Sequence, residues 1–314
     1  MRKKRDIFLG GIVLLLALLI PPLTNDYIVQ VGTEMAMYAA LAGGWNLIGG
    51  LTGYPSFGNV AFFGLSAMLA GALSVNGHWP YWLAAIVAVL GTGIFALLLG
   101  LPLLRLKGHY FSIATLALAQ ATLAVVTNLK FLGGGMGMSL PLIGSPQIFY
   151  YIMLAIAVLS VLITYLLIHS EYGNTLLAIK SDEAAAQAIG INTVLAKSSA
   201  FALSALFGAM AGVVYAIWQS YIDPPTVFEP GITVLMLVMT MIGGAGTVAG
   251  PVIGAVLIGI LTQMAMAVSQ NASSLILGLG IIAVVLFLPN GIMGFRRPGK
   301  GGKRREKNSF PARG

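Results

Sequence analysis

Few residues of this chain are of the types that perform covalent chemistry. The 314 residues include no cysteine, which excludes thiol catalysis, disulfides and cysteine–metal sites. His78, His109 and His169 lie far apart, and we expect them at the ends of separate helices rather than around a metal. Neither an HExxH zinc motif nor a GxxxxGKS/T phosphate loop occurs, and residues 64–67 (GLSA) lack the second glycine of a nucleophile elbow. We therefore predict a protein that is not an enzyme, with no cofactor and no metal site.

Titratable side chains are nearly absent from the long apolar segments, which argues against a proton relay. Glu34 is the one acidic residue near the interior of an apolar segment, and it lies close to the segment's end. A route for a solute would then be lined by neutral polar side chains. The candidates are Asn46, Thr52, Ser56, Asn59, Gln120, Thr240 and Thr247. We expect Asn46 and Gln120 to bury their amides, and for every candidate the alternative role is a structural hydrogen bond between helices.

The composition predicts which elements must position these side chains. The chain is 58% hydrophobic and 8% charged, whereas a soluble domain has about 25% charged residues. Its apolar runs are continuous, so they predict helices, which satisfy their own backbone in lipid, rather than a β-barrel. We predict an all-α, polytopic transmembrane bundle of about ten spans with glycine-broken segments. The predicted spans are residues 7–24, 31–49, 59–75, 81–101, 110–128, 148–168, 198–218, 232–248, 250–269 and 273–290.

The basic residues predict the orientation of these spans. They cluster at residues 2–5 and 296–307, beside the first and last spans, which fits the positive-inside rule better than nucleic-acid binding. With both termini cytoplasmic, the loop at 105–107 and the segment 170–197 also fall inside, and only Lys130 falls outside among the loop cations. We predict that residues 1–297 form the transmembrane domain and that residues 298–314 form a disordered, basic cytoplasmic tail that is attracted to anionic lipid.

The cytoplasmic segment 170–197 is the most polar part of the chain away from its ends. Residues 182–189 are rich in alanine and favour a short helix, which Gly190 is expected to end. Ala184, Ala185, Ala188 and Ile189 would form one small apolar face of this helix, opposite its polar residues.

Two other segments contain too many glycines for regular helices. Residues 43–53, and residues 243–247 together with the preceding Ile242, each contain Ile-Gly-Gly followed by Thr and Gly, one in each half of the chain. Paired glycine-broken segments in two halves are typical of transport pathways and of internal repeats. Chance is an equally good explanation in a chain with 40 glycines.

Four blocks of this sequence resemble the signatures of ABC-transporter permeases for branched-chain amino acids. They occur in the order of that family and are residues 46–64 (NLIGGLTGYPSFGNVAFFG), 105–116 (RLKGHYFSIATL), 178–192 (AIKSDEAAAQAIGIN) and 241–251 (MIGGAGTVAGP). The second block and the chain length resemble the LivM-type branch rather than its LivH-type sister. The resemblance implies a multi-pass permease domain, residues 1–297, in a bacterial or archaeal plasma membrane.

The resemblance also implies partners. The expected ones are a LivH-type sister permease, two cytoplasmic ATPase subunits and an extracytoplasmic substrate-binding protein, all acting at the lipid bilayer without nucleic acid. The short helix would dock on the ATPase through a groove, as a coupling helix. Its expected coupling residues are Asp182, Glu183, Ala184, Ala185, Ala188 and Gly190. In many importers three residues separate EAA from the glycine, but here four precede Gly190, so the register of the motif stays open.

Two alternative functions stay open on the sequence alone. Permeases for urea or short amides share these blocks, which leaves the substrate among Leu, Ile, Val and such amides. A stand-alone secondary transporter or channel would need no ATPase, and transport by this chain alone would identify it.

Overall fold

The computed structural model describes residues 10–11, 14–141, 144–268, 278, 282 and 291–294. Its helices are α2 (Ile20–Leu23), α3 (Asp26–Trp45), the π-helix η1 (Asn46–Gly50), α4 (Asn59–Val75), α5 (Tyr81–Leu103), α6 (His109–Asn128), the 3₁₀ turns η2 (Lys130–Leu132) and η3 (Gly134–Met136), α7 (Pro146–Ile168), α8 (Glu171–Ser181), α9 (Glu183–Ala188), α10 (Thr193–Gln219), α11 (Pro224–Val227), α12 (Pro230–Gly243), α13 (Gly250–Val268) and α15 (Gly291–Gly294). The strands are β1 (Met138–Ser139) and β2 (Tyr221–Ile222). The described part confirms the all-α class.

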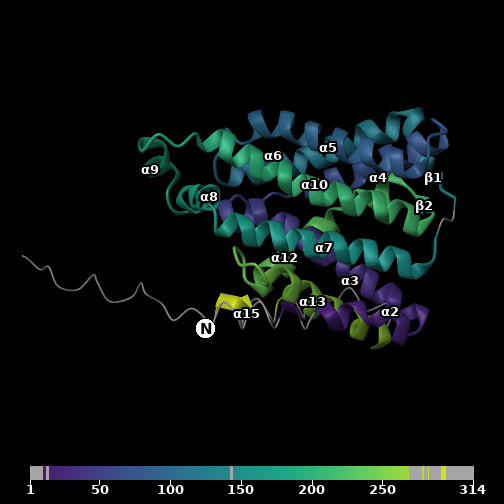
Figure 1. Cartoon of the computed structure of the whole chain (residues 1–314). Helices are drawn as coiled ribbons and strands as arrows, with labels where there is room; N and C mark the ends of the chain where they lie inside the picture. Colours follow the sequence, from purple (N-terminus) through teal and green to yellow (C-terminus); the bar gives the residue numbers. More distant parts are fainter. Residues whose placement is uncertain are drawn as a thin grey trace, which may run out of the picture.

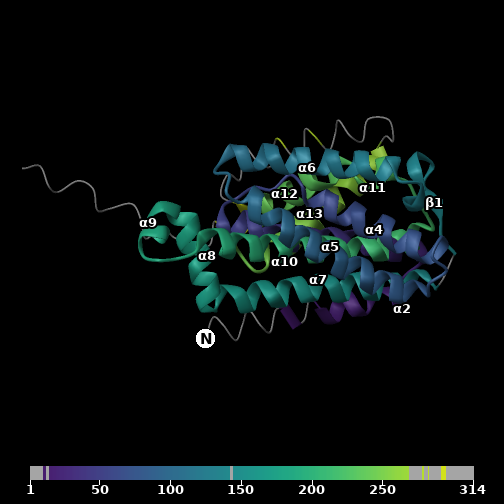
Figure 2. The same ribbon diagram turned by 90° about the horizontal axis from the view of Figure 1, so that it is seen from above.

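The long helices run side by side along one axis. In Figure 1, α8 and α9 project at one end of the bundle, and β1 and β2 lie at the other end. Seen from above in Figure 2, α6 and α7 lie at opposite edges, with α4, α5 and α10 between them. The two ends of the bundle therefore carry different elements, and the candidate sites below are located by these ends.

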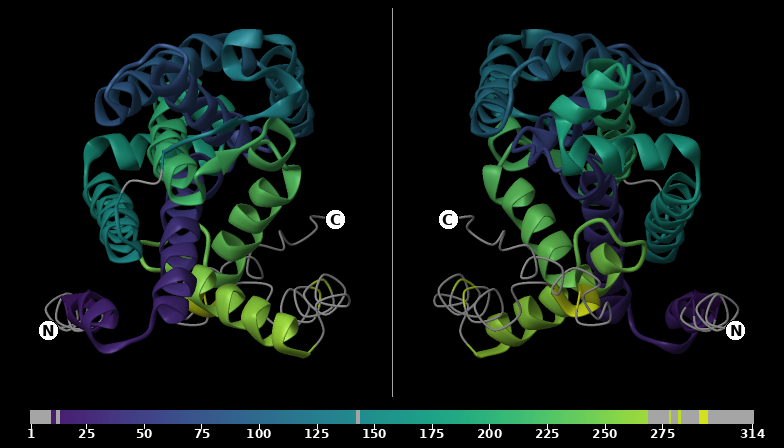
Figure 3. Two further views of the ribbon diagram at one scale, coloured as in Figure 1. Left: turned by 90° about the vertical axis from the view of Figure 1, so that its right-hand side faces the viewer. Right: turned by 90° about the vertical axis from the view of Figure 1, so that its left-hand side faces the viewer.

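Helix α10 is the centre of the bundle. Of its most apolar 18-residue window, 72% is buried, and it packs against α3, α4, α5 and α7. In the end-on views of Figure 3, α3 (purple) stands in the middle, with α7 (teal) on one side and α12 and α13 (green to yellow-green) on the other. Helices α3 and α10 thus connect the two sides of the bundle.

Six helical stretches in the described residues are long and apolar enough to cross a membrane. They are Tyr81–Leu103, His109–Asn128, Pro146–Ile168, Thr193–Gln219, Pro224–Gly243 and Gly250–Ala267. Several have broad exposed apolar faces; on α5, for example, Ile86, Leu90, Ile94 and Leu98 are all more than half exposed. In water such a belt is unfavourable, whereas in hydrocarbon it is the expected surface.

Most of the predicted spans match helices, and two differ. The predicted span 232–248 is wrong at its end, because α12 stops at Gly243 and Gly244 has a φ of +122°. Within the predicted span 7–24, residues 14–18 are helical, the helix is interrupted at Leu19, and α2 begins anew with Pro21 and Pro22 in its first turn. The predicted span 273–290 and the tail 298–314 lie outside the described ranges, apart from two isolated positions in the span.

The segment between α6 and α7 is fixed to the end of α10. Strand β1 pairs antiparallel with β2, with Met138 opposite Ile222, and the Leu140 amide donates to the Ser220 carbonyl over 2.7 Å. This connection orders the end of the bundle that lies opposite α9.

Candidate functional site

The two glycine-broken segments lie against each other, although about 200 residues separate them. The first is the π-helix η1, which continues α3, and the second is the loop after α12. The fully buried Asn46 joins them, because its Nδ2 donates to the Thr247 carbonyl over 3.0 Å and its Oδ1 accepts from the Gly246 amide over 2.7 Å. π-Helical turns inside α-helices are frequent at functional sites. We call this contact the glycine junction.

Gly50 permits the close approach at the glycine junction. A Cβ atom at this position would lie 1.9 Å from Asn46 Oδ1 and 2.7 Å from the Gly246 nitrogen. The Gly50 carbonyl, at the end of η1, accepts from Lys180 Nζ over 2.6 Å. A cation at the carboxyl end of a helical turn is electrostatically favourable, so α8 is attached to the glycine junction.

A second attachment joins α9 to the bundle, and we call it the Glu183 cluster. Lys197 Nζ lies 2.6 Å from Glu183 Oε1, which also accepts from Thr193 Oγ1 over 3.0 Å. The Tyr54 hydroxyl donates to Glu183 Oε2, and Lys197 Nζ lies 4.1 Å from the centre of the Tyr54 ring. The Lys197 side chain is 1% exposed and that of Glu183 is 14% exposed, so the pair is largely excluded from solvent.

The surroundings of Glu183 favour its charged form. Burial acts to raise the pKa of the Glu183 carboxyl, but the hydrogen bonds from Lys197, Tyr54 and Thr193 and the positive charge of Lys197 outweigh it, so the pKa lies below its ordinary value. Burial and the hydrogen bond to Glu183 raise the pKa of the Tyr54 hydroxyl. The cluster is therefore an ion pair with a neutral phenol donor.

Helix α9 has the local structure that its sequence predicts. Asp182 caps its start, because Asp182 Oδ1 accepts from the amides of Ala184 and Ala185 over 2.9 and 3.0 Å. Gly190 ends it with a φ of +89°. The predicted coupling residues differ in exposure: Asp182, Ala184, Ala185, Ala188 and Gly190 are exposed, whereas Glu183 faces the bundle.

Six of the seven predicted pathway residues have side-chain hydrogen bonds inside the chain. Besides Asn46, the Thr52 hydroxyl donates to the Ile48 carbonyl, Thr240 to the Ala42 carbonyl and Thr247 to the Gly244 carbonyl. The Ser56 hydroxyl accepts from the Gly58 amide, and Asn59 Nδ2 donates to Ser204. Asn59 Oδ1 is buried, and no described residue donates a hydrogen bond to it.

The seventh residue, Gln120, lies on an exposed face of α6, so the expectation that its amide is buried is wrong for the chain by itself. The structure thus brings Asn46 together with the Thr247 backbone and leaves Gln120 apart from them. Whether any of the seven contacts a solute stays a prediction.

Sequence reasoning missed three members of the Glu183 cluster, Tyr54, Thr193 and Lys197. Lys197 was assigned only to a cytoplasmic stretch, yet it lies inside α10, four residues after its start at Thr193. The sequence contains only a weak signal for the pairing of Lys197 with Glu183. Lys197 precedes a long apolar run and follows Glu183 by 14 positions, and only the fold brings the two side chains together.

Cations gather at the α8–α9 end of the bundle. Lys180 and Lys197 lie there, and Lys107 is near enough to Lys197 to repel it electrostatically. Lys130 lies in η2, which follows α6 near the opposite end. Among the described residues, no group of three or more His, Cys, Asp or Glu side chains is placed to hold a metal ion.

Comparisons with known proteins agree with the architecture. Residues 27–285 match the family described as "Branched-chain amino acid transport system / permease component". The chain is 25% identical to the high-affinity branched-chain amino acid transport system permease protein LivM of Salmonella typhimurium, over 94% of this chain and 76% of that protein. It is 31% identical to the probable permease protein LivM of Methanocaldococcus jannaschii over 55% and 52% of the two chains, and 24% identical to LivH of Salmonella typhimurium over 82% and 91%.

Proposed function

The chain belongs to the family of branched-chain amino acid transport permease components, and from that premise we propose that it is the membrane-spanning subunit of an ATP-driven importer for leucine, isoleucine and valine. It is a multi-pass membrane protein, as its apolar helices require. Similarity to LivM over 94% of the chain supports the LivM type over the LivH type. The proposed location is the plasma membrane of a bacterium or archaeon.

The proposed partners are a LivH-type sister permease, two ATPase subunits and an external substrate-binding protein. The absence of a GxxxxGKS/T loop from the sequence supports the view that ATP is bound elsewhere. The gathering of Lys107, Lys180 and Lys197 at the α8–α9 end supports a cytoplasmic position for that end. The ATPase subunits would then meet the permease at α9.

The observation that carries this proposal is that α9 exposes an alanine face on one side and is bonded to the helix bundle on the other. Ala184, Ala185 and Ala188 are exposed, and small side chains suit insertion into a groove on a partner. On its other side, α9 is held by the ion pair of Glu183 with Lys197. A movement of the ATPase subunits would therefore reach the bundle through α9, and alternating access would follow from rocking the two permeases against each other.

In this proposal Glu183 has a different role from the other coupling residues. It joins α9 to Tyr54 and Lys197 of its own chain, whereas Ala185 and its neighbours face the ATPase. The seven pathway residues, Asn46 among them, remain predicted contacts of the solute, and their internal hydrogen bonds support an additional structural role.

Co-purification and transport test this proposal. The variant Ala185→Trp places a large side chain on the exposed face of α9 and is expected to abolish ATPase capture and ATP-driven leucine uptake in proteoliposomes. The matched control Ala155→Trp places the same side chain on the exposed face of α7 and leaves both unchanged.

Retention of the ATPase subunits and of uptake in Ala185→Trp would refute docking through α9. Leucine accumulation by this chain without any ATPase would instead favour a stand-alone transporter. Competition by urea or short amides, but not by isoleucine, would favour the amide-type alternative.

A further inference from the structure

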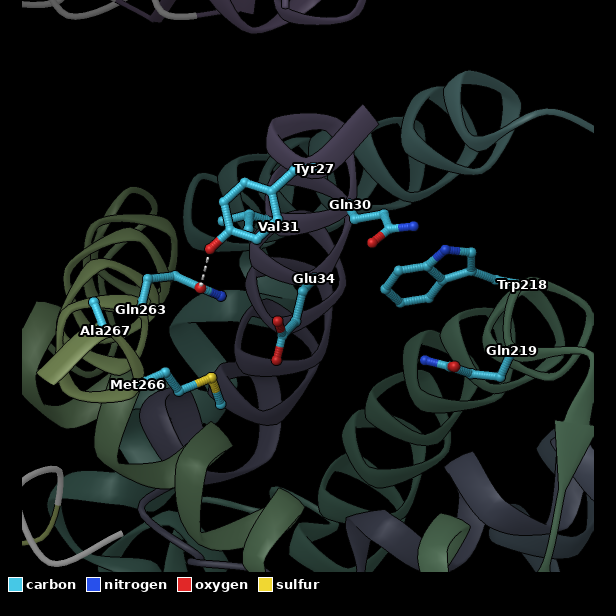
Figure 4. Close-up of a pocket in the computed structure, with 9 residues that line it drawn as sticks. All are labelled: Tyr27, Gln30, Val31, Glu34, Trp218, Gln219, Gln263, Met266 and Ala267. Carbon is cyan, nitrogen blue, oxygen red and sulfur yellow. Dashed lines mark hydrogen bonds between the residues drawn. The ribbon is translucent and has the colours of Figure 1, made fainter. Parts of the chain in front are cut away.

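A cavity of about 470 Å³ opens at the end of the bundle opposite α9. It lies between the first half of α3, the end of α10 and the end of α13, as Figure 4 shows. Its volume falls in the range of small-molecule sites, about 300–1,000 Å³. The polar groups on its wall are Tyr27, Gln30, Glu34, Trp218, Gln219 and Gln263.

Glu34 is the single charged group on this wall, and it is half-buried. Within the described ranges, no side chain or backbone group donates a hydrogen bond to its carboxylate, and no cation pairs with it. The side-chain amides of Gln30 and Gln219 are likewise without a partner there, whereas Gln263 accepts from the Tyr27 hydroxyl over 3.1 Å. Figure 4 shows the Glu34 carboxylate and the Gln219 amide facing the same space.

An acidic side chain among membrane-spanning helices is expensive to keep without a partner, and such residues commonly contact a solute. A cation with N–H donors would be the complementary partner of the Glu34 carboxylate. The side-chain amides of Gln30 and Gln219 can donate hydrogen bonds to, or accept them from, a neutral or anionic group. Val31, Met266 and Ala267 complete the wall with apolar surface. The wall therefore matches a ligand that has an ammonium group beside a short aliphatic chain.

We propose that this cavity binds the α-amino group of the transported solute, with Glu34 as the counter-ion of the ammonium. The proposal rests on the proposed function for the identity of the solute and adds a selective group to it. It assigns the substrate class as primary α-amines with an aliphatic side chain. Urea and 2-oxo acids lack the ammonium group and would not be held.

Chemical labelling of a single cysteine tests the site directly, because the natural chain has no cysteine. Ala267→Cys places an exposed thiol at the edge of the cavity, and the control Leu23→Cys places one on α2, where the side chain is 76% exposed and outside the cavity. Each variant is studied as the full chain assembled with its permease and ATPase partners in nanodiscs, without the binding protein. The rate of maleimide labelling is measured with leucine, leucinamide or 4-methyl-2-oxopentanoate.

We expect leucine and leucinamide to slow labelling at Ala267→Cys, and the 2-oxo acid to have no effect. Adding Glu34→Gln raises the leucine concentration needed for protection at least about tenfold, which corresponds to about 1.4 kcal/mol. Glu34→Asp keeps the charge and retains most of the protection, which also shows that the site is folded. Labelling at Leu23→Cys is unchanged throughout.

Equal protection in the Glu34→Gln variant, or equal protection by the 2-oxo acid, would overturn the assignment. ATP-driven leucine uptake, measured in proteoliposomes of the same proteins, separates this outcome from a failure of the proposed function. If leucine is taken up but its protection against labelling does not depend on Glu34, only the proposed amine-binding role of the cavity is refuted. If the protection depends on Glu34 but no ATP-driven uptake occurs, only the proposal that the chain belongs to an ATP-driven importer is refuted.

Discussion

Replacing Glu183 with Gln should loosen α9 from the bundle while leaving its shape intact. The substitution removes the charge that pairs with Lys197, whose side chain is 1% exposed. It also replaces a carboxylate that accepts from Lys197, Thr193 and Tyr54 with an amide that has one acceptor atom. The buried ammonium group then lacks its counter-ion.

The geometry sets the size of the effect. Breaking a fully buried ion pair by removing one partner costs about 3–5 kcal/mol. Glu183 is 14% exposed, and the Gln carbonyl can still accept one of the donors, so we expect a smaller cost, at or below the lower limit of this range, of about 2–3 kcal/mol. If α9 opens locally, its amide protons then exchange about 30- to 150-fold faster.

Hydrogen–deuterium exchange of the peptide that covers α9 measures this change. Asp182→Asn is the matched control, because it removes one carboxylate from the neighbouring residue and Asn caps a helix about as well as Asp. The double variant Glu183→Gln with Lys197→Met should recover part of the protection, since no unpaired charge remains. If the Gln and Asn variants exchange at the same rate as the wild type, the ion pair does not anchor α9.

Three further predictions concern the bundle and its pH response. Asn46→Ala leaves the partly buried Gly246 amide and Thr247 carbonyl without their bonds to Asn46, so the detergent-solubilised protein should be destabilised by about 2–4 kcal/mol. The measurement is a lower denaturant concentration at the unfolding midpoint. Gly254→Ala should abolish the folded, monodisperse protein in size-exclusion chromatography, because the added Cβ would lie 1.8 Å from the Met239 carbonyl oxygen. The control Gly91→Ala should be tolerated, because a Cβ at Gly91 would have no atom within 4 Å. The pKa of Glu183 is below its ordinary value of 4.5, so the contribution of Glu183 to stability is complete above pH 4.5 and is lost as the pH falls through the lowered pKa. Hydrogen–deuterium exchange of α9, corrected for the intrinsic exchange rate, should therefore become faster in the wild type as the pH falls below 4.5. The Glu183→Gln variant should show no such rise.

Hydropathy predicted the long apolar helices of the described residues but not all their ends. The predicted spans 59–75 and 81–101 match α4 and α5 closely, because polar residues and Pro80 bound two continuous apolar runs. The end of α12 was missed because residues 244–248 are apolar enough to extend a span, and the positive φ of Gly244 is a tertiary feature. Helix α8 was missed because its polar sequence gains stability only by packing against α7, α9 and α10.

The candidate site was predictable in its local parts only. The Asp182 cap and the Gly190 end depend on residues within one turn, and both were predicted from the sequence. The roles of Asn46 and Glu183 depend on partners at distant positions, which periodicity does not reveal. Gln120 shows the opposite error, because an amide in an apolar helix was expected to be buried, yet a span in lipid can expose one.

The positions of Lys180 and Glu183 bear on how a movement of α9 would spread. The two residues are three apart, and they hold the same short segment near its two ends, through the Gly50 carbonyl and the Tyr54 hydroxyl. Between these points Gly53 has a φ of +76°, and a Cβ there would lie 3.1 Å from the Lys180 side chain, so the segment and α8 are in close contact. The segment is bonded in turn through Asn46 to the loop after α12. A tilt of α9 therefore either breaks these bonds or moves both glycine-broken segments together. Only the second outcome would transmit work from the proposed ATPase partner to both halves of the chain.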